Sequence, residues 1–115
     1  MRRIGLLLLV LAMVTAAGIL TPAAAQTAEE GQKVFADQRC SLCHMVEGKG
    51  NKRGPLDGVG DKWNAEELAQ WIRTPAEMAA KVEATRKPPM KSFASLPDAD
   101  VDALVAYLLT LKSAP

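Results

Sequence analysis

The chain has 115 residues, of which 49% are hydrophobic, 23% are charged and only 4% are aromatic, and its formal net charge is +1. This length accommodates one small domain and excludes a multidomain protein. The near-neutral charge argues against nucleic acid as a partner, because domains that bind nucleic acid are strongly basic.

The first 25 residues have the features of a secretory signal peptide. Arg2 and Arg3 form a basic start, residues 4–20 are almost wholly apolar, and Ala23-Ala24-Ala25 supplies the small residues of a cleavage site. We predict cleavage after Ala25, which would leave residues 26–115 in the periplasm of a bacterium with no membrane anchor. The alternative is an uncleaved anchor, for which the apolar run is near the minimum length.

The exported domain would have 90 residues, with two Trp, two Phe and one Tyr. It would keep 12 of the 14 Lys and Arg residues and all 13 Asp and Glu residues, which gives a net charge near −1. An apolar core alone is marginal at this size, so such domains often depend on a disulfide, a metal or a cofactor. The two cysteines of the chain are therefore informative.

Three helices and a shorter fourth one are predicted, and no strand pattern is convincing, so the expected fold class is all-α. The first helix covers residues 28–37, with Gly31, Val34 and Phe35 at helical spacing, and it leads directly into the cysteine motif. A loop rich in Gly, Lys and Asn follows over residues 48–60.

The second helix is predicted to begin at Asn64, because Asn64 and Glu67 have the spacing of a capping box. One face of it carries the apolar side chains Leu68, Trp71 and Ile72. Thr74-Pro75 is expected to end or kink this helix, since proline lacks a backbone donor and disfavours helix at the residue before it. Proline also suits the first position of a new helix, so a short one is predicted over residues 76–84.

The last helix is predicted to follow an extended segment. Pro88-Pro89 forces the chain to be extended as it enters Met90. The helix starts near Pro97, where three aspartates favour its positive N-terminus. Its buried stripe is expected to be Val101, Leu104, Val105, Leu108 and Leu111.

The motif that carries chemistry is Cys40-Ser41-Leu42-Cys43-His44. Two cysteines separated by two residues and followed at once by histidine form the attachment pattern of a c-type haem. The thiols of Cys40 and Cys43 would each form a thioether with one vinyl group of a single haem. His44 would then donate its imidazole nitrogen to the iron as the proximal ligand.

Three other interpretations of this motif compete with haem attachment. Cys40 and Cys43 could form a short disulfide in an oxidising compartment. A thioredoxin-like redox pair would need a βαβ setting, which the sequence does not indicate. A zinc site would need four ligands, and the chain has no Cys or His beyond the motif to complete it.

His44 is the single histidine of the chain, so the second axial ligand must be of another type. A methionine thioether suits an electron carrier and raises its reduction potential. Two methionines belong to the signal peptide, and Met45 adjoins His44 too closely to reach the other side of the iron. Met78 and Met90 remain, and we favour Met90 because its segment is stiffened by two prolines, while Met78 suits a helix core.

At this point the residues resemble the small monohaem class I cytochromes c over nearly all of the exported domain. The resemblance rests on the Gly31…Phe35 spacing, on the attachment motif and on Leu104-Val105-Ala106-Tyr107-Leu108 near the C-terminus. It implies the cytochrome c fold, with helices and Gly/Pro-rich loops wrapped around one haem. It also implies that the first and last helices cross closely at Gly31, where a side chain would not fit.

The resemblance assigns further residues to the cofactor. In Gly54-Pro55-Leu56, it implies that the carbonyl of Pro55 accepts a hydrogen bond from His44 and that Leu56 packs on the haem. Trp63 would donate to a haem propionate, although a place in the ordinary core is an equal alternative. The distal side would be lined by Leu68, Trp71, Ile72, Pro75, Met90 and Phe93.

The function implied is one-electron transfer, not catalysis, with unidentified redox proteins as partners and a monomeric carrier. Two alternatives are a haem subunit of a larger periplasmic oxidoreductase and a ligand-binding haem sensor with a labile sixth ligand. Six basic residues could steer the carrier toward acidic partners, or could simply form a solvated surface. They are Lys49, Lys52, Arg53, Arg86, Lys87 and Lys91.

Overall fold

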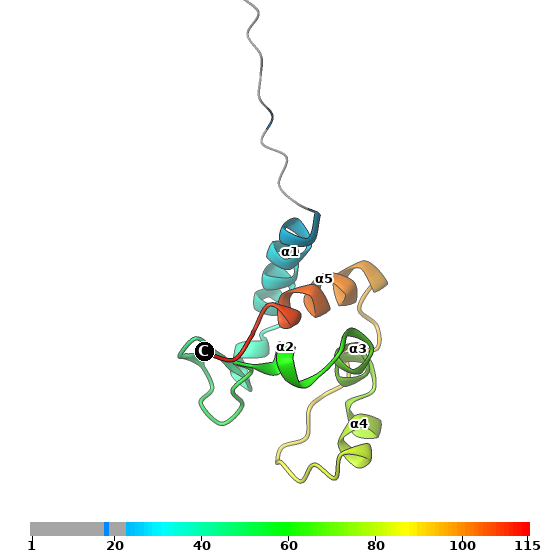
Figure 1. The fold of residues 1–115 in the computed structure, drawn as a ribbon. Coiled ribbons are helices and arrows are strands. Elements are labelled where there is room, and N and C mark those ends of the chain that lie inside the picture. Colours follow the sequence, from blue (N-terminus) through cyan, green and yellow to red (C-terminus); the bar gives the residue numbers. More distant parts are fainter. Residues whose placement is uncertain (1–17, 19–22) are drawn as a thin grey trace, which may run out of the picture.

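The computed structural model describes residue 18 and residues 23–115, which form a helical domain (Figure 1). Its elements in chain order are α1 (Ala23–Asp37), the 3-10 turn η1 (Cys40–Leu42), β1 (Met45–Val46), β2 (Lys49–Gly50), α2 (Val59–Lys62), α3 (Ala65–Arg73), α4 (Pro75–Lys81) and α5 (Asp98–Leu109). The all-α expectation is confirmed, apart from the small ribbon of β1 and β2.

The predicted signal peptide lies almost entirely outside the described residues. Its predicted cleavage point after Ala25 falls within the first turn of α1, which starts at Ala23. Among the described residues, no helix is both long and apolar enough to cross a membrane.

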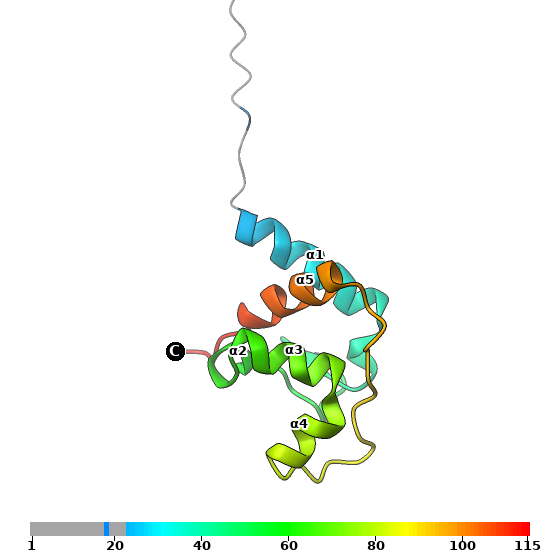
Figure 2. The same ribbon diagram turned by 90° about the vertical axis from the view of Figure 1, so that its right-hand side faces the viewer.

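Helix α1 lies across helix α5, as Figures 1 and 2 show. Gly31 is buried at this crossing, and a Cβ atom there would overlap the backbone of Ala103 and lie 2.7 Å from the Cβ of Tyr107. The rings of Phe35 and Tyr107 meet edge to face nearby, with centroids 5.6 Å apart. The close crossing at Gly31 implied by the sequence is therefore observed, and glycine is required there by space.

The hydrophobic core is built mainly from α3 and α5. Leu68 and Ile72 of α3 are each only 2% exposed, and they pack with the buried face of α5. The predicted stripe of α5 is confirmed, because each of its members is buried: Val101, Leu104, Val105, Leu108 and Leu111. The packing of α3 on α5 holds the C-terminal end of α3 in place. The chain that follows α3 carries part of the candidate site.

Helix α3 begins as the sequence predicts. The side chain of Asn64 accepts from the backbone N–H of Glu67, and the Glu67 carboxylate accepts from the N–H of Asn64, both at 2.9 Å. Helix α4 starts with Pro75 at its first turn, one residue earlier than expected. It also ends earlier, at Lys81, because Glu83 adopts a left-handed backbone with φ of 55°.

The β1–β2 ribbon was not predicted. Val46 pairs with Lys49, so only Glu47 and Gly48 form the turn, and both have positive φ, at 49° and 78°. Two successive left-handed residues define the tight hairpin turn that matches strand twist. Glycine is the usual residue for such a position but glutamate is not, so the pattern Glu47-Gly48 gave no hairpin signal.

The C-terminal segment closes over α2. The N–H of Gly60 donates to the carbonyl of Leu111 at 3.0 Å, and the Lys112 ammonium donates to the carbonyl of Gly60 at 2.8 Å. The N–H of Ser113 donates to the Asp61 carboxylate at 2.7 Å. These bonds hold α2 and the following Trp63 against the end of α5.

Candidate functional site

The Cys40–His44 motif folds into one tight turn. Arg39 precedes it in a left-handed conformation, and the N–H groups of Cys43 and His44 both donate to the carbonyl of Cys40, at 3.1 and 2.9 Å. Cys40 is half-buried, Cys43 is exposed, and both are free thiols. The turn thus brings two reactive sulfurs and one imidazole into a single short segment.

The ring of His44 is oriented by the backbone of Gly54. Its Nδ1 lies 3.1 Å from the Gly54 carbonyl oxygen, which can only accept, so Nδ1 carries the hydrogen. In a neutral ring the other nitrogen, Nε2, then has a free lone pair. Such a bond to the non-ligating nitrogen is typical of histidines that bind a metal.

This bond corrects the expectation for Pro55. The structure assigns the acceptor to Gly54, because Met45 and Pro55 form a parallel bridge. In this bridge the N–H of Met45 donates to the Gly54 carbonyl at 2.9 Å, and the N–H of Leu56 donates to the Met45 carbonyl at 2.8 Å. The Gly54 carbonyl therefore faces His44 and Met45. The side chain of Pro55 itself is exposed.

Burial lowers the pKa of His44 below its usual value, and the nearby positive charge of Arg86 lowers it further. The hydrogen bond to Gly54 opposes this shift without reversing it. The neutral imidazole is therefore favoured, and this is the form that can ligate a metal.

Burial is also the main influence on Cys40, and it raises the pKa of the unattached thiol. The charge of Cys43 also raises this pKa. A hydrogen bond to the backbone of Cys40 and the positive charge of Lys91 lower it. An unattached Cys40 is thus held as the thiol, which does not suit a redox-active thiolate pair.

The loop after the turn is bound back to it through Asn51, which was not among the residues predicted for the site. The Asn51 side chain donates to the carbonyl of Leu42 at 3.0 Å, and its N–H contacts the carbonyls of Ser41 and His44. Gly50 packs against the His44 carbonyl so closely that a Cβ atom would overlap it. An Asn in a Gly-rich loop is a turn signal, but nothing local in the sequence identifies its partners.

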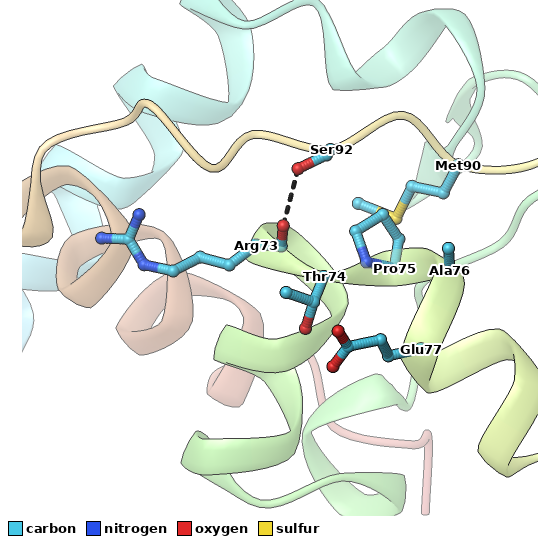
Figure 3. A pocket seen from close by; sticks show the side chains of 7 residues that line it. All are labelled: Arg73, Thr74, Pro75, Ala76, Glu77, Met90 and Ser92. Atoms are coloured by element: carbon cyan, nitrogen blue, oxygen red, sulfur yellow. Dashed lines mark hydrogen bonds between the residues drawn. The ribbon is translucent and has the colours of Figure 1, made fainter.

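The segment that carries Met90 is anchored to the end of α3. The hydroxyl of Ser92 donates to the carbonyl of Arg73 at 2.6 Å, as Figure 3 shows, and the N–H of Phe93 donates to the carbonyl of Ile72 at 2.9 Å. Met90 is half-buried, and its side chain points toward Pro75 (Figure 3). Both line a small pocket together with Arg73, Thr74, Ala76, Glu77 and Ser92.

Arg73 strengthens this anchor. Its guanidinium donates to the carbonyls of Ala94 and Leu96, at 3.0 and 3.1 Å, and forms an ion pair with Asp98. Five contacts from the last two residues of α3 therefore fix the chain that follows Met90. Arg73 and Ser92 could not be selected from the sequence, because their partners are about 20 residues away.

The remaining residues predicted for the site are either buried in the core or packed at its rim. Leu68 and Ile72 are fully buried, while Leu56, Trp63 and Phe93 pack at the rim of the core. The rings of Trp63 and Trp71 meet edge to face with centroids 5.9 Å apart. Met78 is only 1% exposed within α4, so it is core material in this structure, as its helical setting led us to expect.

A family model described as cytochrome c matches residues 28–112 of the chain. The chain belongs to the cytochrome c family. Subunit 2 of cytochrome c oxidase from Alkalihalophilus pseudofirmus is 31% identical over 94 residues, which are 74% of this chain and 26% of that subunit. The chain therefore spans about a quarter of the length of this curated relative. No solved structure matches it.

Membership of the cytochrome c family implies haem c and electron transfer, and the residues of the turn fit that cofactor. Two free thiols and an imidazole with Nε2 available stand on one turn. The indole Nε1 of Trp71 is buried and has no hydrogen-bond partner among the described residues, so it is a donor suited to an acceptor on a cofactor.

Two of the alternatives for the motif can be compared with the described part of the chain. It contains no group of three or more His, Cys, Asp or Glu side chains that could hold a metal such as zinc. Its β1 and β2 form an antiparallel ribbon of two residues each, not the βαβ unit of a thioredoxin-like protein.

Proposed function

We propose that this protein is a periplasmic one-electron carrier whose single haem c is attached through Cys40 and Cys43 and ligated by His44 and Met90. The proposal rests on hydrogen bonds to backbone carbonyls that hold the His44 ring and the segment next to Met90. The Gly54 carbonyl orients His44, and the bonds of Ser92 and Phe93 to α3 hold the chain beside Met90.

Haem c supplies an iron centre that accepts and returns one electron. The residues of this chain supply the setting. His44 offers Nε2 from a ring whose neutral form is favoured, and the bond from its Nδ1 to Gly54 makes it a better donor to the metal. Met90 offers a thioether, which raises the reduction potential compared with a second nitrogen ligand.

A carrier must keep its ligands in place while the charge of the site changes by one. The anchors at Arg73 and Ser92 serve this purpose, because they limit how far the Met90 segment can move. If His44 and Met90 both hold the haem iron, they would leave no ligand position for a substrate. This supports a role in electron transfer without catalysis.

The test is the optical spectrum of the oxidised holoprotein and of two matched variants, Met90→Leu and Met78→Leu. Leucine keeps the volume of methionine but has no sulfur. We expect Met90→Leu to lose the long-wavelength iron–sulfur charge-transfer band and Met78→Leu to keep it. A band that survives in Met90→Leu and disappears in Met78→Leu would assign the ligand to Met78 instead.

A second candidate function is that of a haem subunit bound permanently to a terminal oxidase. It is favoured by the similarity to a cytochrome c oxidase subunit 2. Size-exclusion chromatography of gently solubilised native extract separates the two candidates. A free carrier elutes as a small protein, whereas a subunit elutes with the large oxidase.

A further inference from the structure

Arg86 makes a contact that its position in the chain does not suggest. It lies in the irregular segment that runs from α4 to α5 (Figure 2), four residues before Met90. Its Nη2 nevertheless donates to the carbonyl of Cys43 at 3.0 Å. Cys43 is the second attachment residue and immediately precedes His44, so Arg86 joins the Met90 segment to the turn that carries the other ligand.

The guanidinium of Arg86 also lies against Gly54. A Cβ atom at Gly54 would lie 2.8 Å from Nη2, and it would overlap the carbonyl of Cys43 as well. Gly54 is the residue whose carbonyl holds Nδ1 of His44. Arg86 therefore contacts both the Cys43 carbonyl and Gly54, the two backbone groups next to His44. A side chain at Gly54 would push these groups apart.

The positive charge of Arg86 is not neutralised nearby. Among the described residues the ion pairs are Lys33–Asp37, Arg73–Asp98 and Lys112–Asp61, and none of them includes Arg86. A guanidinium stays protonated at every pH at which the protein folds. A permanent positive charge therefore lies against the backbone next to His44, with the Arg86 side chain exposed to solvent and the His44 ring half-buried.

We propose that Arg86 is a positioning residue with two effects. It ties the segment that carries Met90 to the attachment turn, Cys40–His44, and its fixed positive charge favours the reduced state of the carrier. This inference rests on the proposed His44 and Met90 ligation. Reduction brings one electron from a donor protein and lowers the charge of the site by one, and Arg86 neither gains nor loses a proton. A fixed positive charge therefore stabilises the reduced product relative to the oxidised reactant and raises the reduction potential.

The two parts of the role can be separated by substitution. Arg86→Lys keeps the positive charge but replaces the planar fork with a point charge that cannot make the same contacts. Arg86→Gln removes the charge and shortens the reach. Lys87→Gln is the matched control, because it removes one positive charge from the neighbouring exposed residue, for which the structure shows no side-chain bond to the turn.

The experiment measures the reduction potential of each holoprotein and the denaturant midpoint at which the iron–sulfur band disappears. We expect Arg86→Gln to have a more negative potential, with a shift clearly larger than that of Lys87→Gln, and Arg86→Lys to stay near the wild type. We expect both Arg86 variants to lose the band at lower denaturant than Lys87→Gln does.

The controls keep the two proposals distinct. A wild-type protein without the band or without a reversible one-electron couple would overturn the proposed function itself. A normal wild type whose Arg86→Gln and Lys87→Gln variants have equal potentials and equal midpoints would overturn the role of Arg86 alone. If Arg86→Gln does not accumulate as folded protein, Arg86→Lys still decides the positioning role through the band midpoint.

Discussion

Single glycines determine how closely backbone segments approach one another in this protein. At Gly31 the helix α1 meets α5, and at Gly54 the loop meets the attachment turn. Both residues are buried, and a Cβ atom at either position would overlap a backbone carbonyl, of Ala103 or of Cys43. A backbone carbonyl cannot rotate away as a side chain can, so any larger residue must push the two segments apart.

Gly31→Ala is therefore expected to destabilise the protein although alanine is the better helix former. The gain in helix propensity is about 1 kcal/mol at most, whereas overpacking in a close contact typically costs about 1–3 kcal/mol. Chemical denaturation monitored by circular dichroism measures the change. Gln32→Ala, at the exposed neighbouring position, is the control and should be neutral or slightly stabilising. An equally stable Gly31→Ala variant would show that α1 and α5 can move apart at this crossing without cost.

At the scale of elements, Arg73 makes the main connection between α3 and the segment that follows Met90. Arg73 donates to the carbonyls of Ala94 and Leu96 and pairs with Asp98. The Asp98 side chain is 96% exposed, so its ion pair adds little to stability. The bonds to the two carbonyls come from an Arg73 side chain that is only 28% exposed, and they carry most of the effect.

Arg73→Gln should loosen the Met90 segment before the rest of the protein unfolds. We expect the iron–sulfur band to disappear at clearly lower denaturant than the helical signal does, because the helices themselves keep their core. Asp98→Asn is the matched control, since it removes the ion pair but leaves both carbonyl bonds of Arg73 intact. Coincident loss of band and helix in Arg73→Gln would mean that the segment is not held by Arg73.

The connection of α2 to the C-terminus gives a prediction about pH. The pKa of Asp61 is lowered from its usual 3.8, mainly because the N–H of Ser113 donates to its carboxylate, with a contribution from Lys112. A lowered pKa in the folded state adds stability above the unfolded pKa, and this stability is lost as the pH falls through the folded value. The stability difference between wild type and Asp61→Asn should thus be constant near neutral pH and vanish in acid.

Urea denaturation of both proteins, at neutral pH and at a series of values below 3.8, measures this difference. Asp61 is exposed, so the difference should be small and should shrink further at high salt. Asp102→Asn, on the exposed side of α5, removes one carboxylate elsewhere in the protein and is the control. A difference that persists unchanged in strong acid would contradict the contribution of the Asp61 charge.

The elements that could be predicted from the sequence are those with local causes. The capping box at Asn64, the helix start at Pro75 and the stripe of α5 depend on residues within a few positions of one another. The contacts that shape the site join distant residues instead. Arg86 is 43 residues from Cys43, so neither composition nor periodicity could identify their bond.

The acceptor for His44 shows a different limit. The loop Gly54-Pro55-Leu56 could be selected from its sequence, but the carbonyl that faces His44 depends on the register of the bridge between Met45 and Pro55. A shift of one residue along an extended chain reverses the direction of its carbonyls. The prediction of Pro55 in place of Gly54 was wrong for this reason.

At the scale of the whole molecule, the charges are distributed unevenly around the attachment turn. Arg86 and Lys91 act electrostatically on His44 and Cys40, respectively, and the loop bound to that turn by Asn51 carries further basic residues. The exposed cations of the two segments are Lys49, Lys52, Arg53, Arg86, Lys87 and Lys91. The net charge of the exported domain would still be near −1, so these cations form a local field that its overall charge does not reveal.

This field predicts opposite salt effects for small redox reagents of opposite charge. Oxidation of the reduced protein by ferricyanide, an anion, should slow as ionic strength rises, because salt screens its attraction to the basic residues. A cationic cobalt(III) complex should react faster under the same change. Lys91→Gln should weaken the salt dependence of both reactions more than Lys81→Gln does. The charge of Lys91 acts on the Cys40 thiol, whereas Lys81 lies at the end of α4. If both reagents follow the net charge, with ferricyanide accelerated by salt, electrons leave the protein from a part of its surface remote from these cations.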